Sequence, residues 1–153
     1  MRLSDALSAQ RIVLDLKAQT KDEAIEEMIA VAAAGGGVNE PPARLAKLVL
    51  EREALTSTAV DKGVAIPHAR SPHIEGIVVS LGIHRQGLDF GSPDGDPVHL
   101  VFLVLSGETA TPAYLSILGR TARIFRRAQM LQSVLAATTA EEILRSIAAH
   151  ERV

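Results

Sequence analysis

The chain has 153 residues, of which 47% are hydrophobic and 22% charged, and its formal net charge is -2. This length and composition suit one packed globular domain and exclude a disordered chain, while the small net charge gives no long-range attraction to nucleic acid or to an anionic membrane. The sequence contains no cysteine, which excludes disulfides, thiolate nucleophiles and cysteine-ligated zinc.

No secretory or membrane-spanning segment is predicted. An acidic residue, Asp5, stands where a signal peptide would begin its apolar run. The longest apolar stretches, at residues 77–83 and 98–105, are far shorter than the about 20 residues that span a bilayer. We therefore expect a cytoplasmic, bacterial-type protein with no membrane insertion. The sequence shows neither repeats nor linkers, which predicts a single domain over residues 1–153.

The first part of the chain predicts a helical turn, a strand and a helix. The turn covers residues 4–7, and residues 12–16 form a short β-like run. Thr20 and Glu23 match a capping box, after which apolar residues recur at helical spacing. The residues expected on the apolar face of this helix are Ile25, Met28, Ile29 and Ala32.

The glycines at residues 35–37 are predicted to end this helix. They follow a helix and lack the Lys and Ser/Thr of a phosphate-binding P-loop, so no such loop is expected. Asn39 is the expected N-cap of a second helix, with Pro41 and Pro42 in its first turn. The residues expected on the apolar face of this second helix are Leu45, Leu48 and Val49.

The pattern changes from helical to strand-like after Arg52. Runs rich in branched residues at 64–66, 77–83 and 98–104 predict strands of one sheet. The segment 91–97 is rich in Gly, Pro and Asp and predicts a turn between the last two strands.

The last third of the chain predicts two helices. The first begins at Thr111 and Pro112, and its apolar face is expected to comprise Leu115, Leu118, Ala122 and Phe125. The arginines placed largely on the opposite face are Arg120, Arg123, Arg126 and Arg127. They could dock an acidic partner, but a charged helix face is more often simply solvated, and solvation is the favoured interpretation. The final helix starts at Thr139, with Glu142 completing a capping box. The residues that it is expected to bury are Ile143, Leu144 and Ile147.

The strongest chemical signal is a histidine at the end of an apolar run. His68 directly follows Pro67, and proline stiffens the backbone on both sides of itself. The imidazole is therefore expected at a strand end rather than within the strand. An unperturbed pKa of about 6.5 leaves one ring nitrogen free to attack near neutral pH, which suits a phosphoryl relay.

A phosphoryl group also needs partners for its charged oxygens. Arginine and hydroxyl or backbone N–H donors supply them in other phosphoryl-transfer sites. The candidates near His68 in the sequence are Arg52, Ser57 and Thr58, with Arg70 as a further one.

Residues 51–70 as a whole resemble the A-domain (EIIA) of the bacterial sugar phosphotransferase system, in its fructose/mannitol class and including the nitrogen-regulatory EIIA branch. The family pattern is an Arg-Glu pair, then a Ser-Thr pair, then Gly, Ile or Val, Ala, Ile, Pro and His. The matching residues here are 52–53, 57–58 and 63–68, and the resemblance extends from Leu7 to Ile147.

The resemblance implies an α/β fold with a mixed sheet of about five strands and helices packed on both faces. It implies that His68 receives a phosphoryl group from the histidine of HPr, the small general phosphocarrier protein, or its nitrogen-branch counterpart. His68 would pass the group to a cysteine of an EIIB domain or use it as a signal to a regulatory target protein. Arg52 would stabilise the phosphoryl group, and Ser57 and Thr58 would line its pocket. No cofactor and no metal are expected, and a homodimer is left open.

Two positions depart from the family pattern. Many relatives carry a second histidine beside the first, just before a leucine, where this chain has Tyr114 followed by Leu115. A tyrosine hydroxyl can still form hydrogen bonds, but with an ordinary pKa of about 10 it does not exchange charge near neutrality. Thr56 stands where many relatives have glycine, which changes the loop without removing a reactive group.

Other functions were weighed against this one. The chain could be a non-catalytic regulatory binding module of the same fold, with Tyr114 as a sign of lost transfer. A metal enzyme using His68, His73 and His84 has neither a helical His pair nor a supporting carboxylate motif. A serine hydrolase would need a Gly-x-Ser-x-Gly elbow, which the sequence lacks. The sequence does not decide between sugar transport and nitrogen regulation.

Overall fold

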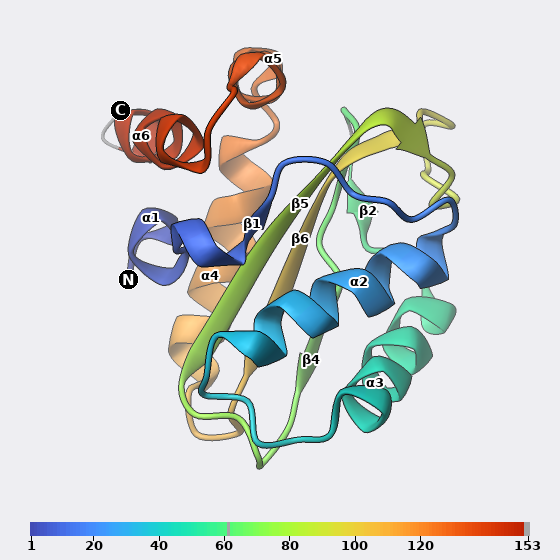
Figure 1. Cartoon of the computed structure of the whole chain (residues 1–153), viewed down its shortest axis with the longest axis vertical. Coiled ribbons are helices and arrows are strands. Elements are labelled where there is room, and N and C mark those ends of the chain that lie inside the picture. The colour runs from blue at the N-terminus through green and yellow to red at the C-terminus, as the bar shows by residue number, and fades with distance from the viewer. Residues whose placement is uncertain (61, 152–153) are drawn as a thin grey trace.

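The computed structural model describes residues 1–60 and 62–151. Helices lie on both faces of a central sheet, with α2 and α3 on one side and α1, α4, α5 and α6 on the other (Figure 1). The elements are α1 (Leu3–Ala6), η1 (Ala9–Arg11), β1 (Ile12–Val13), α2 (Lys21–Ala34), α3 (Pro42–Leu55), β2 (Ala59–Val60), β3 (Val64–Ala65), β4 (His68–Arg70), β5 (Ile77–Leu88), β6 (Val98–Ser106), α4 (Thr111–Ile124), α5 (Ala128–Ala136) and α6 (Ala140–Glu151). Among the described residues, no helix has both the length and the apolar character needed to cross a bilayer.

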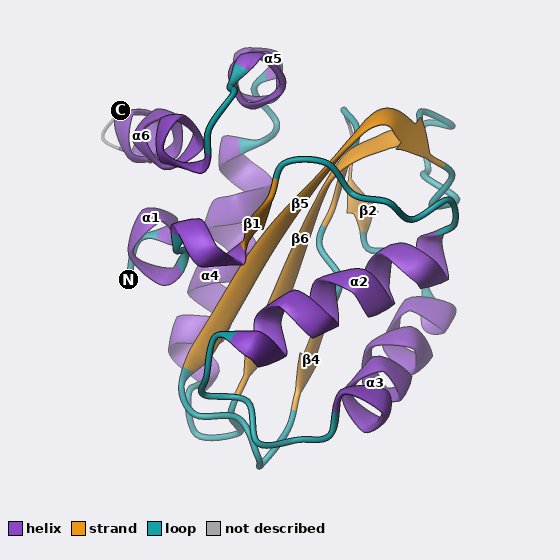
Figure 2. Ribbon diagram, viewed as in Figure 1, coloured by secondary structure: helices purple, strands orange, loops and turns teal. Residues whose placement is uncertain are grey.

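The sheet is mixed and is built around the long antiparallel pair β5 and β6 (Figure 2). Its strand order is β1-β5-β6-β3-β2. Strand β4 also pairs with β6, further along β6 than β3 does. Strands β1, β3 and β4 run parallel to their long neighbours, whereas β2 is antiparallel to β3. The predicted mixed sheet with helices on both faces is confirmed, with six strands in the described chain where about five were expected.

The predicted run at 64–66 and His68 belong to two separate strands. Strand β3 ends at Ala65 and β4 begins at His68, so Ile66 and Pro67 lie between them. Proline has no N–H to donate to a ladder, but the Pro67 carbonyl still accepts the Val104 N–H at 2.9 Å. The backbone before His68 is therefore held against β6.

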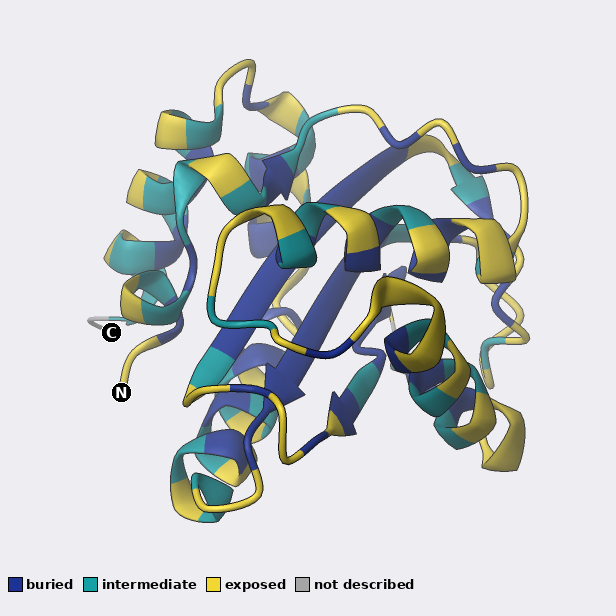
Figure 3. Cartoon of the chain, turned by 60° about the horizontal axis from the view of Figure 1, so that its bottom comes forward, coloured by how far each residue is buried: buried dark blue, intermediate teal, exposed yellow. Residues whose placement is uncertain are grey.

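Both faces of β6 are buried, and its side chains alternate between two hydrophobic cores. Leu100, Phe102 and Val104 pack with the residues of α4, α5 and α6. Val101 and Leu103 pack on the opposite face with those of α2 and α3. Figure 3 shows the strands buried and the outer faces of the helices exposed. This double burial explains why the strand reads as a continuous apolar run rather than an alternating one.

The layer formed by α2 and α3 agrees with most of the sequence prediction. The Glu23 N–H donates to the Thr20 side chain at 3.2 Å, which confirms the capping interaction, and the predicted apolar face is buried. The prediction that Asn39 caps the second helix is wrong, because α3 begins at Pro42 with Pro41 as its N-cap. The Asn39 N–H instead donates to the His73 carbonyl at 2.8 Å.

The layer on the other face differs more from the prediction. Helix α4 starts at Thr111 as expected. Its predicted apolar face is partly confirmed, because Phe125 is buried and Leu118 and Ala122 pack against the core, but Leu115 is 60% exposed. The buried positions of α4 are Tyr114, Ile117, Thr121 and Ile124. A separate helix, α5, was not predicted. In α6, Thr139 accepts the Glu142 N–H as expected, although the Glu142 side chain bonds to Thr138 rather than completing the box with Thr139.

Candidate functional site

The site is centred on His68, the first residue of β4, which is half-buried. Its Nδ1 lies 2.8 Å from the carbonyl oxygen of Ile66. A carbonyl oxygen only accepts hydrogen bonds, so Nδ1 carries the ring proton in this contact. The neutral imidazole therefore keeps its free electron pair on Nε2, which makes Nε2 the nucleophilic atom.

The surroundings of His68 keep the imidazole neutral. Burial lowers the pKa of His68 below its ordinary value of 6.5, and the positive charge of Arg52 lowers it further. The hydrogen bond to Ile66 and the negative charge of Glu53 oppose this change and raise the pKa. Because the net direction is downward, the nucleophilic form predominates at neutral pH.

The residue in the place of the family's second histidine lies beside His68. The Tyr114 ring, in the first turn of α4, contacts the imidazole edge-on, with ring centroids 6.0 Å apart and planes at 65°. Burial raises the pKa of Tyr114 above its ordinary value of 10.0, so its hydroxyl stays uncharged at neutral pH. Tyr114 can therefore pack against the imidazole and orient it, but it cannot act as a second charged group.

Two arginines border the pair of rings. The Arg70 guanidinium lies 5.6 Å from the centre of the Tyr114 ring and donates to the Glu108 carbonyl at 2.7 Å and to the Thr111 hydroxyl. Arg52, in the last turn of α3, donates to the Thr56 carbonyl at 3.1 Å. Its charge also acts on both His68 and Tyr114, which places Arg52 in the same local environment.

A buried carboxylate supports the loop between α3 and β3. Glu53 is 3% exposed, and its carboxylate accepts the Thr58 N–H at 2.9 Å and the Thr58 hydroxyl at 2.5 Å. Lys21 of α2 completes the group with an ion pair at 3.1 Å. Buried charges need such partners, because desolvation without them is very costly. The sequence prediction assigned no role to Glu53 or Lys21.

The two predicted hydroxyl residues lie on this loop, but their hydroxyl hydrogens are already engaged. The Ser57 hydroxyl donates to the Phe90 carbonyl at 2.9 Å and accepts the Ala59 N–H at 3.1 Å. The Thr58 hydroxyl donates to Glu53, and the Thr58 carbonyl accepts the Ile66 N–H at 3.2 Å. In this conformation Thr58 holds the loop against the segment that leads to His68, and Ser57 holds it against Phe90.

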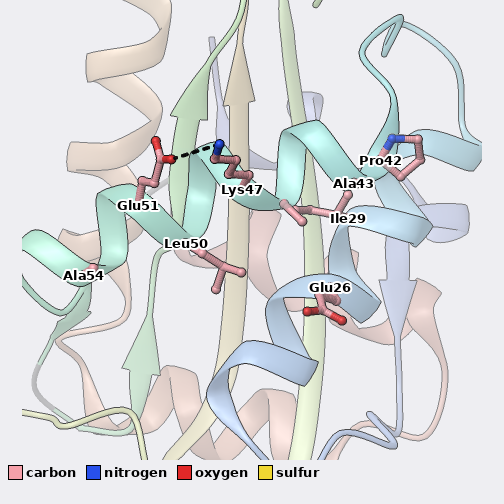
Figure 4. Close-up of a pocket in the computed structure, with 9 residues that line it drawn as sticks. Glu26, Ile29, Pro42, Ala43, Lys47, Leu50, Glu51 and Ala54 are labelled. Atoms are coloured by element: carbon pink, nitrogen blue, oxygen red, sulfur yellow. Dashed lines mark ion pairs between the residues drawn. The ribbon is translucent and has the colours of Figure 1, made fainter.

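Two leucines on the helices that carry Arg52 and Tyr114 are exposed. Leu115, next to Tyr114, is 60% exposed, and Leu55, at the end of α3, is 82% exposed. A groove of about 660 Å³ between α2 and α3 lies apart from this surface, and His68 does not line it (Figure 4). Exposed leucines on α3 and α4, the helices that carry Arg52 and Tyr114, suit contact with another protein.

The remaining histidines give no metal centre in the described part of the chain. Within that part, no group of three or more His, Asp or Glu side chains is arranged to hold a metal ion. The Nδ1 atom of His99 lies 3.0 Å from the His84 carbonyl, and the Nε2 atom of His84 lies 2.8 Å from the Ala18 carbonyl. These two histidines therefore make structural hydrogen bonds.

Comparison with known proteins agrees with this geometry. Residues 5–150 match the family model described as "Phosphoenolpyruvate-dependent sugar phosphotransferase system, EIIA 2". The chain is 37% identical to a nitrogen regulatory protein of Bradyrhizobium diazoefficiens over 143 residues, covering 94% of this chain and 92% of the relative. It is 30% identical to the fructose-specific EIIABC component of Bacillus subtilis, of which it spans only 24%.

Solved structures show the same fold. The nitrogen regulatory protein IIA-Ntr from Neisseria meningitidis superposes with a TM-score of 0.88 at 29% identity, covering 95% of this chain and 98% of the other. The mannitol IIA protein of Escherichia coli superposes with a TM-score of 0.78 at 23% identity, covering 92% and 97% respectively. The family match over nearly the whole chain and the agreement in fold show that this chain belongs to the EIIA type 2 family of the phosphoenolpyruvate-dependent sugar phosphotransferase system.

Proposed function

We propose that this chain is a phosphohistidine carrier that acts in the cytoplasm, where A-domains of this system work. His68 takes a phosphoryl group from the histidine of HPr or of its nitrogen-branch counterpart. It then passes the group to a cysteine of an EIIB domain or retains it as a signal to a regulatory target. The observation that carries this proposal is the hydrogen bond between Nδ1 of His68 and the Ile66 carbonyl, because it leaves Nε2 free for attack.

Transfer of the phosphoryl group to His68 does not require His68 to lose a proton. The electron pair on Nε2 of His68 attacks phosphorus, and the bond between phosphorus and the donor nitrogen breaks, returning its electron pair to that nitrogen. The His68 ring then carries the phosphoryl group on Nε2 and a proton on Nδ1, so it bears a positive charge. The Ile66 carbonyl and the negative charge of Glu53 both stabilise that charge.

The onward step reverses the first. Attack by an acceptor thiolate breaks the bond between Nε2 and phosphorus, and its electron pair returns to Nε2, which restores the neutral imidazole. Arg52 is the group proposed to offset the negative charge on the phosphoryl oxygens, because it is the cation whose field reaches His68. We propose that Ser57 and Thr58 line the phosphoryl site. Their loop would change conformation when the phosphoryl group binds, so that their hydroxyl or N–H groups can donate to it.

The exposed leucines near His68 support protein partners on this face. Burying Leu55 and Leu115 on docking would remove apolar surface from water and would close off the reacting atoms. A solved complex joins the mannitol IIA protein of Escherichia coli, 23% identical to this chain, with phosphorylated mannitol IIB. We propose an EIIB domain as one acceptor for this chain.

The regulatory branch is favoured over sugar transport by one observation. The nitrogen regulatory protein of Bradyrhizobium diazoefficiens is 37% identical to this chain, whereas the fructose-specific components of Bacillus subtilis and Haloferax volcanii are 30% and 28% identical. Binding assays with candidate regulatory targets, using the phosphorylated and unphosphorylated forms, would separate the two roles. A sugar-transport role predicts that the phosphorylated form is consumed by an EIIB domain.

The decisive experiment is labelling with phosphoenolpyruvate, its protein kinase and the phosphocarrier, followed by intact mass measurement. Wild type should gain the mass of one acid-labile phosphoryl group, and His68→Ala should gain none. His73→Ala is the matched control, because His73 is an exposed histidine outside the site and its loss should leave labelling intact. If wild type is not labelled by carriers of either branch, the carrier function is wrong and the non-catalytic binding module replaces it.

A further inference from the structure

A cluster of arginines surrounds a hollow at the far end of α4 from the His68 site. The hollow has a volume of about 240 Å³ and lies between the C-terminal ends of α4 and α6. The residues that line it are Arg120, Arg123, Ile124, Arg127, His150 and Glu151. In Figure 1 this end of α4 lies beside α5 and α6, away from β4.

The guanidinium groups of this cluster lack acceptors within the described residues. No hydrogen bond or ion pair of the described chain involves the side chains of Arg120, Arg123 or Arg127, and Nε of Arg120 is buried without a partner. Four arginines elsewhere in the chain donate to backbone carbonyls, namely Arg11, Arg52, Arg70 and Arg85.

The carboxylate that lines the hollow is already occupied. Glu151 accepts the N–H of Leu3 at 2.6 Å and the N–H of Ser4 at 2.9 Å, one on each oxygen. These bonds attach the end of α6 to the start of α1. With His150 counted as neutral, the three arginines and Glu151 give the lining of the hollow a net charge of about +2.

Solvation alone does not explain this arrangement well. A cation near a helix C-terminus gains from the helix dipole, which accounts for one arginine in the last turn of α4. It does not account for three guanidinium groups converging on one hollow, because like charges held together repel one another. An anion bound between them would relieve this repulsion and supply the missing acceptors.

We propose that this hollow binds a small molecule carrying a diphosphate or longer phosphate chain. Guanidinium groups match phosphate oxygens through paired, charge-assisted hydrogen bonds, and several of them favour a ligand with several adjacent negative charges. The hollow is formed from two helix ends and is bounded on more than one side, which suits a small ligand better than the flat surface of an acidic protein. Arg126 is exposed, as Arg123 and Arg127 are, but unlike them it does not line the hollow.

This site is independent of the proposed phosphoryl transfer. Tyr114 is in the first turn of α4, whereas the hollow is lined by Arg120 and Ile124 of the same helix, which lie roughly 9 Å and 15 Å further along its axis at 1.5 Å per residue. A ligand in the hollow leaves His68 accessible to a protein partner.

The test is a titration of the full chain with inorganic pyrophosphate at constant ionic strength, followed by calorimetry and by amide chemical shifts. Wild type should bind one equivalent saturably, more tightly than it binds inorganic phosphate. Arg123→Gln should weaken binding by about tenfold or more, as expected for loss of a charge-assisted contact. Arg120→Lys, which keeps the charge but loses the paired geometry, should also weaken it. Arg126→Gln removes the same charge next to the hollow and should change the affinity by less than about twofold.

Several outcomes would overturn the proposal. One is the absence of saturable pyrophosphate binding at millimolar concentrations. Another is an equal loss of pyrophosphate affinity in Arg126→Gln and Arg123→Gln, which would indicate a diffuse positive surface. Binding of a polyglutamate peptide, with dependence on Arg126 and without pyrophosphate binding, would instead assign the surface to an acidic protein. Thermal denaturation of each variant establishes that it is folded, and phosphorylation of His68 in the same variants shows that the two sites fail independently.

Discussion

The buried carboxylate of Glu53 gives the sharpest prediction on stability. The substitution Glu53→Gln removes a charge that is 3% exposed, that accepts two hydrogen bonds from Thr58 and that pairs with Lys21 at 3.1 Å. Loss of one partner of a fully buried ion pair costs about 3–5 kcal/mol. The Lys21 side chain is 26% exposed and can regain water, so we expect the free energy of unfolding to fall by about 2–3 kcal/mol.

The same substitution should also act on the reactive histidine. The charge of Glu53 raises the pKa of His68, so Glu53→Gln should lower that pKa further. Urea denaturation measures the first effect, and an NMR titration of the His68 ring protons measures the second. Glu51→Gln is the matched control on the same helix: its side chain is 62% exposed and lies 4.0 Å from Lys47, so it should change stability by less than about 1 kcal/mol. Equal effects of the two substitutions, or a raised His68 pKa, would refute the reasoning.

Three further predictions concern the site. Because burial lowers the pKa of His68, the rate of labelling should hold as the pH falls from 7 through 6.5 and decline only below that value; a rate that is already halved near pH 6.5 would contradict this. Tyr114→Phe keeps the ring beside His68 and should label within about tenfold of wild type, whereas Tyr114→Ala, at a position 6% exposed, should destabilise the fold by roughly 3 kcal/mol in a thermal melt; complete loss of labelling in Tyr114→Phe would show that the hydroxyl is essential. Leu115→Ser should leave the unfolding free energy within about 0.5 kcal/mol of wild type but raise the KM for the phosphocarrier, and an unchanged KM would place the docking surface elsewhere.

Local signals in the sequence predicted most of the elements. The Thr20 capping box and the Thr111-Pro112 start act within one turn of their own helices, and the structure has helices beginning there. The N-cap at Asn39 was wrong because a tertiary contact decides that segment. Val38 forms a bridge with Ile74, and the Asn39 N–H bonds to the His73 carbonyl, so the helix begins later.

The predicted apolar face of α4 was only partly right, for a different reason. Apolar residues in this helix follow helical spacing in two phases, one residue apart, so periodicity alone does not select the buried one. The buried phase includes Thr121, which a hydropathy pattern places on the surface. Its hydroxyl donates to the Ile117 carbonyl at 2.8 Å, which satisfies the polar group and allows burial.

The site itself was only partly predictable. The family pattern named His68 and Arg52, and in the structure the charge of Arg52 lowers the pKa of His68; the roles of both in phosphoryl transfer stay a prediction. The Lys21–Glu53 pair joins residues of two different helices, and no local pattern indicates such a contact. The hydrogen bond that sets the ring nitrogen of His68 involves a backbone carbonyl, which every residue has, so its geometry emerges only from the fold.

NMR of the phosphorylated protein with nitrogen-15 in its histidines identifies the ring nitrogen that carries the phosphoryl group. We expect coupling of phosphorus to Nε2 of His68, with the proton retained on Nδ1 opposite the Ile66 carbonyl. Attachment to Nδ1 of His68, or to any other residue, would contradict this expectation.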